Sequence, residues 1–377
     1  MHTRHMRLRS AAGMSLVELM VSITIGVMLM TGLVAVFNSS GEARRELEKS
    51  GQLIENGRYA VSLLFEDLHH AGFYGHFYRL GDALAALPDP CEVAGTGNTD
   101  DLEAATAMPI QGYAAADIDS LPDIDSTTTC ETALLTDANL KLGSDIVIIR
   151  RADTAVFTGA AEAKDIYLQA NSRAMNLLVG NASATVPAKA ANNATQTMEK
   201  YPDKGSQCSS DTDKCADTRK YRVHVYFVAP CSFGTGANNV CQDGDDEVPT
   251  LKRLELGSDG TSTLMEIMPL VEGVEYMKVE YGIDTTPTDV NGATGLAGDG
   301  VPDEYKDEPA VGEWPLVVSV RIYILARNVT GTVEYSDAKT YQLGAMSAGP
   351  FEDTFKRRLF HTEVRPMNLA GRREIPK

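Results

Sequence analysis

The most apolar part of the chain lies near its start, where residues 14–37 are almost all Leu, Val, Ile, Met, Ala or Gly. A helix rises about 1.5 Å per residue, so a helix of this length spans about 36 Å. That length exceeds the roughly 30 Å hydrocarbon core of a bilayer. The pattern therefore predicts a helix that can cross a membrane.

An amphipathic pattern follows without a break. Apolar residues recur at helical spacing among charged ones, at Leu47, Ile54, Val61, Leu64, Phe65 and Leu68. We expect one helix to run from about residue 14 to about residue 70, with its second half packed under a globular domain. Gly72, in the segment HHAGFYG, can adopt the left-handed conformation that ends a helix.

Later segments alternate apolar and polar residues and predict β-strands. Alternate apolar residues share one face of WPLVVSVRIYILAR, namely Leu316, Val318, Val320, Ile322 and Ile324. Further strands are predicted at DIVIIRRA, DIYLQ, YRVHVYFV, LKRLEL, VEYMKVEYG, KTYQLG and LFHTEVR. One long helix before mostly antiparallel strands predicts an α+β fold, in which an apolar sheet face covers the amphipathic half of the helix.

Length and charge narrow the class of protein. The chain has 377 residues and a formal charge of -18 at pH 7. The length allows one large domain or two ordinary ones. Nucleic acid is an unfavourable partner, because phosphate binding requires a basic surface that this composition does not suggest. The acidity indicates a well-solvated exterior instead.

All the cysteines follow the apolar stretch, at Cys91, Cys130, Cys208, Cys215, Cys231 and Cys241. None forms a C-x-x-C pair, which disfavours a zinc site. Disulfides formed in an oxidising compartment are the better interpretation. Proximity in sequence suggests Cys208 with Cys215, Cys231 with Cys241, and Cys91 with Cys130, which is one of fifteen pairings that six cysteines permit.

One carboxylate, Glu18, interrupts the apolar stretch, and no Lys or Arg lies between residues 14 and 37. An acid at the centre of a membrane helix costs about 2.5–3.5 kcal/mol and usually has a partner. Arg4, Arg7 and Arg9 precede the stretch, so the N-terminus is expected in the cytoplasm and the bulk of the chain outside. A secretory signal fits poorly, since the stretch is too long for one. A plain signal anchor explains everything except Glu18.

Cleavage after Gly13 would supply a partner for that acid. The new α-amino group would stand four residues before Glu18, but a free helix terminus frays, so its own chain is an imperfect partner. A neighbouring copy, offset along a helical stack, can place its amine against Glu18 in a dry environment where the attraction is strong.

The run Gly13-Met14-Ser15-Leu16-Val17-Glu18, behind a short basic leader and ahead of an apolar helix, resembles the class III signal of type IV prepilins and pseudopilins. The resemblance implies that prepilin peptidase cuts after Gly13, that the new N-terminus at Met14 is methylated, and that Glu18 guides assembly. This family most often has Phe at the position of Met14.

Four blocks further resemble the PilW-type minor pilins, namely ENGRYAVSLLFEDLHHAGFYG, VEGVEYMKVEYGID, EWPLVVSVRIYILAR and RRLFHTEVRPMNL. In the last block Met367 stands before Asn368, where the family habitually has Arg. The resemblance implies a pilin-like fold and a structural subunit of a priming or tip complex in type IV pilus assembly. Its implied partners are the other minor pilins, the major pilin and a tip adhesin. The J-type pseudopilins of type II secretion have a similar architecture and are the nearest alternative.

These inferences divide the chain into a leader (1–13), a transmembrane or filament-core helix (14–40), its amphipathic continuation (41–72) and a globular domain (73–377), loop-rich over about 80–220 and a β-sheet over about 221–377. The expected location is the inner membrane, with the globular domain in the periplasm, and then the pilus at the surface of a Gram-negative bacterium.

A third hypothesis is a membrane-anchored exported enzyme or binding protein that uses the helix only as a tether.

The sequence has no motif for catalysis, and we expect neither an enzyme nor a cofactor-dependent protein. The leading metal candidate is an acidic, Gly-rich loop whose oxygen donors are Asp289, Asn291, Asp299 and Asp303. Such donors suit Ca²⁺, but their spacing departs from that of an EF-hand loop. A solvated hairpin loop is therefore favoured over a calcium site.

Overall fold

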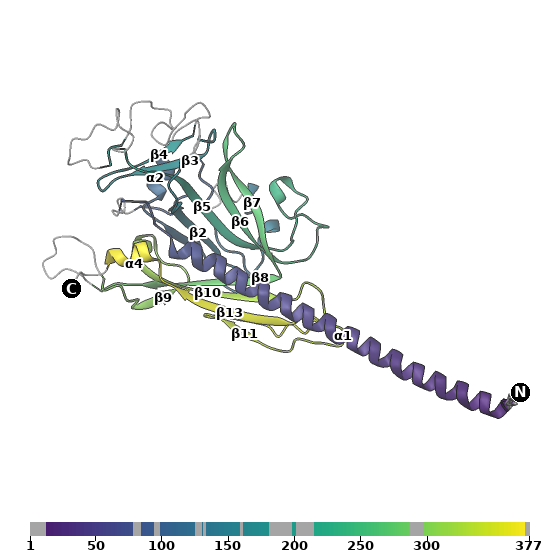
Figure 1. The fold of residues 1–377 in the computed structure, drawn as a ribbon. Coiled ribbons are helices and arrows are strands. Elements are labelled where there is room, and N and C mark those ends of the chain that lie inside the picture. Colours follow the sequence, from purple (N-terminus) through teal and green to yellow (C-terminus); the bar gives the residue numbers. More distant parts are fainter. Residues whose placement is uncertain are drawn as a thin grey trace, which may run out of the picture. The chain divides into compact units, whose positions relative to one another are not determined.

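The computed structural model describes residues 13–77, 84–93, 99–124, 130, 133–158, 161–180, 198–200, 215–286 and 298–373. A single long helix, α1 (Leu16–His69), precedes a series of mostly antiparallel strands (Figure 1). This arrangement confirms the predicted α+β class. The chain divides into two compact units, Met1–Gly51 and Gln52–Lys377. The second unit is called the head below.

The larger sheet of the head has the strand order β1-β2-β5-β3-β4, and β5 also pairs with β6, which pairs with β7. All its pairings are antiparallel. Its strands are β1 (Ile110–Tyr113), β2 (Ile146–Ala152), β3 (Ile166–Ala170), β4 (Met175–Val179), β5 (Thr218–Ala229), β6 (Thr250–Ser258) and β7 (Thr263–Glu272). The segment expected to be loop-rich, residues 80–220, thus supplies four strands, and the sheet continues across residue 220 through β5.

The second sheet has the order β13-β10-β8-β9, also antiparallel, and β11 and β12 form a separate hairpin. Its elements are β8 (Val274–Ile283), β9 (Glu304–Lys306), β10 (Val317–Arg327), β11 (Tyr341–Leu343), β12 (Met346–Ala348) and β13 (Arg357–Val364). The short helices are α2 (Asp100–Ala105), α4 (Met367–Arg373) and the 3-10 turns η1 (Asp137–Asn139), η3 (Ala237–Asn239) and η4 (Val311–Leu316).

The larger sheet is buried on both faces along β2 and most of β5. In β2, Ile146 and Ile148 belong to one apolar cluster, whereas Val147 and Ile149 belong to another. The second cluster also contains side chains of β8, β10, α4 and the head segment of α1. It fills the layer in which α1 lies between the two sheets (Figure 1). The apolar sheet faces therefore cover this part of the helix, as the pattern predicted.

The buried stripe of α1 differs from the predicted one. Its buried residues are Leu53, Gly57, Ala60, Leu64, Asp67 and Leu68, spaced at three or four positions. Leu47 is 73% exposed and Phe65 is 42% exposed, so the expectation for these two was wrong. Leu47 lies before the head, which begins at Gln52, and Phe65 lies about 100° around the helix from the buried Leu64.

Gly57 permits the closest approach between α1 and a strand. A Cβ at this position would lie 2.1 Å from the ring of Phe360 in β13. The Phe360 ring therefore packs directly on the helix backbone. At the end of the helix Gly72 has φ +70, the left-handed conformation predicted for it.

Two of the three suggested cysteine pairs are disulfides in the structure, Cys91–Cys130 and Cys231–Cys241. Both lie in the apolar cluster on the outer face of the larger sheet. The third suggested pair includes Cys208, which lies outside the described residues.

Candidate assembly site

The predicted cleavage position lies just before α1. Gly13, Met14 and Ser15 are exposed and non-helical, and the helix begins at Leu16. Beyond its chain neighbours, no heavy atom of a described residue lies within 4 Å of the place where a Cβ on Gly13 would stand. The Gly13–Met14 bond is thus in an open segment, the kind of backbone that a peptidase can bind. Residues 1–12, with the three predicted leader arginines, lie outside the described residues.

Glu18 lies in the first turn of α1, where the partial positive charge of the helix N-terminus favours an acid. The side chain is exposed, and no described residue hydrogen-bonds to its carboxylate or forms an ion pair with it. Ser22 Oγ donates to the Glu18 carbonyl at 2.7 Å, and Thr24 and Thr31 likewise donate to carbonyls of the preceding turn. These hydroxyls are satisfied within the helix. Glu18 is the only charged residue between 14 and 41, so it alone needs an ionic partner from elsewhere.

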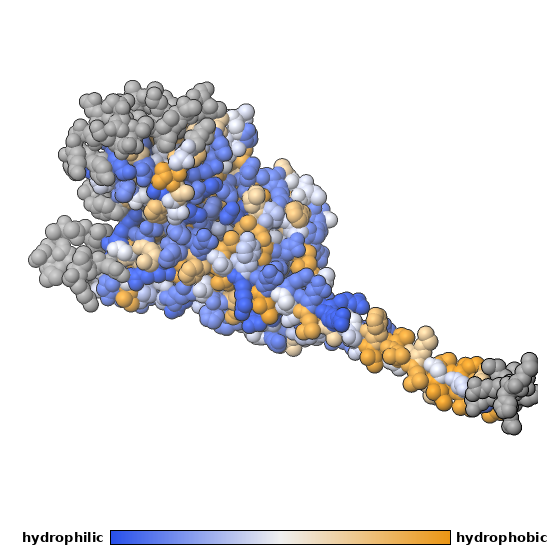
Figure 2. Space-filling view, in the orientation of Figure 1, coloured by the Kyte–Doolittle hydropathy of each residue, from blue (hydrophilic) through white to orange (hydrophobic). Residues whose placement is uncertain are grey.

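The apolar side chains around Glu18 are exposed along the whole first half of the helix. Figure 2 shows this stretch as an almost continuous hydrophobic surface. An 18-residue window of α1 has a mean hydropathy of 2.3, and none of it is buried. The helix is therefore long and apolar enough to cross a membrane.

The second half of α1 is fixed to the larger sheet by a buried carboxylate that the sequence analysis missed. Asp67 accepts hydrogen bonds from His224 Nδ1 at 2.6 Å and from the Tyr226 hydroxyl at 3.0 Å, both on β5. Its other oxygen accepts from Arg151 Nε on β2 at 2.5 Å. Asp67 stands between Leu64 and Leu68 on the buried face. This single acid within an apolar stripe was the feature of the sequence that could have pointed to the cluster.

This cluster continues to Glu255 on β6. His224 Nε2 lies 3.7 Å from Glu255 Oε1, and the guanidinium groups of Arg222 and Arg253 each donate to Glu255 at 2.7 Å. Burial alone would raise the pKa of Asp67, but His224 and Arg151 outweigh it and hold the pKa well below its usual value. The hydrogen bond and charge of His224, together with the charges of Arg253 and Arg222, outweigh the effect of burial and lower the pKa of Glu255 to about 2. Both acids are therefore charged at neutral pH.

The C-terminal helix α4 closes the end of α1. Asn368 Nδ2 donates to the carbonyl of Ala71 at 3.1 Å, and Arg372 donates to the carbonyl of Gly72 at 3.1 Å. These side chains hydrogen-bond the turn that follows the last helical residue, His69. Met367, the residue that departs from the family habit, is 53% exposed and begins this helix.

The described part of the predicted calcium loop uses its carboxylates within the protein. Asp303 accepts from the amide and hydroxyl of Thr285 at 2.8 and 2.9 Å. Asp299 accepts from the amide of Val301 at 2.9 Å. The neighbouring Asp284 is buried and pairs with Arg373 of α4 at 3.3 Å. Asp289 and Asn291 lie outside the described residues.

Comparisons with known proteins find a family that the later strands match. The model of the family PilW, type IV pilus-assembly protein W, matches residues 225–368. The match runs from β5 to the start of α4, includes the last three of the four resembling blocks, and covers less than half of the chain. The predicted resemblance is confirmed over these residues. No curated protein and no solved structure matches the chain.

Proposed function

We propose that this chain, a PilW-type protein of type IV pilus assembly by the match of residues 225–368, is a minor pilin that acts as a structural subunit. The observation that carries the proposal is Glu18, which has no ionic partner among the described residues and lies in the first turn of an exposed apolar helix. In this role α1 is held in the inner membrane until the subunit moves into a filament. The role uses no catalytic residue and no cofactor.

When neighbouring helices replace lipid around α1, the free energy of its apolar contacts changes little, because lipid tails are as apolar as Leu. Pairing of Glu18 with the α-amino group of an adjacent subunit therefore selects the register between helices. That amine exists only after prepilin peptidase has cut between Gly13 and Met14, and its methylation would keep the positive charge. The open, non-helical segment around Gly13 supports this processing step.

We further propose that the subunit belongs to a priming or tip complex with other minor pilins, next to the major pilin and a tip adhesin. The head comprises most of the chain, from Gln52 to Lys377. A head of that size suits the end of a filament better than repeated positions along its shaft. The PilW match favours the pilus over a type II secretion pseudopilus.

The experiment that tests this proposal replaces Gly13 by Val in the chromosomal copy. We expect mass spectrometry to detect the uncut leader on the variant and electron microscopy to show loss of surface pili. Gly41→Val is the matched control, since Gly41 is an open helical position with no atom within 4 Å of an added Cβ. Mature wild-type protein that still carries residues 1–13 would refute the proposal.

A second variant separates processing from assembly. Glu18→Ala removes the charge but leaves the cleavage segment intact, so we expect a processed, membrane-bound subunit that no longer enters pili. Ser22→Ala, which removes only a hydrogen bond within the helix, is expected to assemble normally. Normal pilus formation by Glu18→Ala would show that the helix serves only as a tether.

A further inference from the structure

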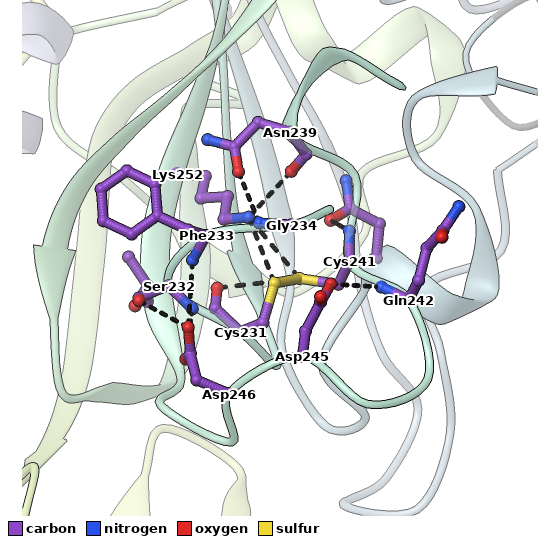
Figure 3. Close-up of a disulfide and its surroundings, with 12 residues drawn as sticks. Cys231, Ser232, Phe233, Gly234, Asn239, Cys241, Gln242, Asp245, Asp246 and Lys252 are labelled. Carbon is purple, nitrogen blue, oxygen red and sulfur yellow. Dashed lines mark hydrogen bonds between the residues drawn. A yellow bond between two sulfur atoms is a disulfide. The ribbon is translucent and has the colours of Figure 1, made fainter. Parts of the chain in front are cut away.

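The two disulfides that join described residues of the head, Cys91–Cys130 and Cys231–Cys241, have neighbours of opposite charge. The ammonium group of Lys252 lies 3.6 Å from Cys231 Sγ and 3.5 Å from Cys241 Sγ, and it donates to the carbonyl of Asn239 at 3.0 Å (Figure 3). At the other disulfide, a carboxylate oxygen of Asp89 lies within 4.8 Å of both sulfurs, those of Cys91 and Cys130.

Lys252 is a buried cation without a counterion in contact. Its side chain is on β6 and is fully buried. Among the described residues, no carboxylate lies within 4.0 Å of its ammonium group. Burial lowers the pKa of Lys252 to about 8, although Asp246 and Asp245 oppose this shift. The group is therefore mainly charged at neutral pH, and a buried charge gains free energy from a nearby anion.

The carboxylates of the surrounding loop accept hydrogen bonds from other residues of the same loop. Asp246 accepts from both the amide and the hydroxyl of Ser232 at 2.8 Å. Asp245 accepts from the amide of Gln242 at 2.7 Å and from the hydroxyl of Thr235 at 2.8 Å. Figure 3 shows Asp245 and Asp246 on the loop around the disulfide, with the Lys252 ammonium against the two sulfurs. The nearest atoms that can become an anion beside Lys252 are thus the sulfurs.

A cavity gives small molecules access to this disulfide. It has a volume of about 440 Å³, and both Cys231 and Cys241 line it. Exposed residues Asp243 and Gly244 also line it, so the cavity reaches the surface. Cys231 and Cys241 are buried, at 2% and 3% exposed. Their sulfurs are therefore reached by a small thiol that enters the cavity, and not by a bulky flat surface.

We propose that Cys231–Cys241 is a thiol–disulfide exchange site, and that Lys252 promotes the exchange by stabilising the thiolate that leaves. In the first step the thiolate of an external dithiol attacks one cysteine sulfur. A new S–S bond forms, the Cys231–Cys241 bond breaks, and its electron pair moves to the other cysteine sulfur beside the ammonium group. The second thiol of the dithiol, after losing its proton to solvent, attacks the mixed disulfide. The dithiol is thereby oxidised and both cysteines are reduced.

The two neighbouring charges act in opposite directions on this equilibrium. A cation beside a cysteine favours its thiolate, and a thiolate stabilised in the reduced protein makes the disulfide easier to reduce. The carboxylate of Asp89 disfavours a thiolate at Cys91 or Cys130. Cys231–Cys241 is therefore the more easily reduced of the two. This inference goes beyond the proposed assembly role and does not depend on it.

The test uses the full chain in detergent at pH 7, equilibrated with mixtures of reduced and oxidised dithiothreitol. Free thiols are then alkylated, and mass spectrometry measures the reduced fraction of each disulfide. We expect Cys231–Cys241 to be half reduced at a ratio of reduced to oxidised dithiothreitol at least tenfold lower than Cys91–Cys130. A tenfold difference corresponds to about 30 mV for a two-electron couple. Equal midpoints, or the reverse order, would overturn the proposal without any variant.

Variants of Lys252 and Asp89 test whether these two charges cause the difference between the midpoints of the two disulfides. Lys252→Met keeps the length of the side chain without its charge, and we expect it to move the midpoint of Cys231–Cys241 at least fivefold toward stronger reductant. Lys252→Arg should restore most of the shift. In Asp89→Asn the midpoint of Cys91–Cys130 should move in the opposite direction. If Lys252→Met leaves the midpoint unchanged, Lys252 has no role, whatever the order in the wild-type protein.

Discussion

At the scale of single residues, Asp67 explains why α1 takes one position on the larger sheet. Three donors from two strands converge on its carboxylate, from Arg151, His224 and Tyr226. A buried charge is costly unless it is paired and hydrogen-bonded. Rotating or sliding the helix would leave the acid and its donors unpaired, so the cluster fixes the helix by excluding other registers.

The lowered pKa values of Asp67 and Glu255 predict that the head loses stability in acid. A group whose pKa is lower in the folded state contributes stability above its unfolded pKa and loses it as the pH falls toward the folded value. For Glu255 the change from 4.5 to about 2 corresponds to a contribution on the order of 3 kcal/mol. As these two acids are protonated, we expect the melting temperature of the full chain in detergent to fall between about pH 5 and pH 2. Circular dichroism at a series of pH values measures this.

The variant Asp67→Asn measures how much of the acid-dependent loss of stability comes from Asp67 and its hydrogen-bond partners. The variant should be less stable at neutral pH, because it loses a charged acceptor, and its melting temperature should change less between pH 5 and pH 2. The exposed loop substitution Asp243→Asn serves as the control and should keep the wild-type profile. An acid-dependent loss as steep in Asp67→Asn as in wild type would contradict the role given to Asp67.

At the scale of elements, the contact between α1 and β13 depends on the missing side chain of Gly57. A Cβ there would overlap the Phe360 ring at 2.1 Å. We expect Gly57→Ala to destabilise the head by about 1–3 kcal/mol, although Ala is the better helix former by about 1 kcal/mol. Gly51→Ala, where nothing lies within 4 Å, should be neutral or stabilising. Urea denaturation of the full chain measures both.

The double variant Gly57→Ala/Phe360→Leu provides a check on the mechanism. If the clash with the ring is the cause, the smaller side chain at residue 360 should recover part of the lost stability. A Gly57→Ala protein as stable as Gly51→Ala would show that β13 can move away from the helix without cost.

The elements differ in how well their sequence patterns predicted them. All seven further segments predicted as strands contain or overlap one, and β2 and β8 were predicted almost in full, because long alternating or apolar runs carry a strong signal. β7 was missed, since Pro269 interrupts its alternation. In β10 the pairing with β8 is irregular between Val317 and Ser319, and Val317 joins Val320 in the same apolar cluster. A bulge of this kind shifts side chains from one face to the other, and alternation alone does not reveal it.

The candidate site was predicted at one end of α1 and missed at the other. Gly13 and Glu18 stand out because an apolar sequence makes any exception visible. Asp67 stands out less, because other acids such as Glu55 and Glu66 occur in the same amphipathic segment. Its importance depends on His224 and Arg151, which are far away in sequence and are brought to it only by the fold.

At the scale of the whole molecule, one apolar cluster joins both sheets and the head segment of α1. It includes Leu64 and Leu68 of the helix, Val147 of β2, and Val279 and Ile322 of the second sheet. A cluster shared by three layers cannot lose one layer without exposing the others. The head should therefore unfold as one cooperative unit even though it contains two sheets.

This argument predicts that substitutions in different layers weaken the same unfolding transition. Leu64→Ala in α1 and Ile322→Ala in β10 remove side chains that are 0% and 1% exposed, and each should cost about 2–5 kcal/mol. Phe65→Ala, at the adjacent but 42% exposed position, should cost far less. In urea, tryptophan fluorescence of the buried Trp314 and far-ultraviolet circular dichroism should report coincident midpoints for every variant, with an unchanged dependence on urea. If Leu64→Ala separates the two probes, the helix and the sheets unfold independently, and the shared cluster does not couple them.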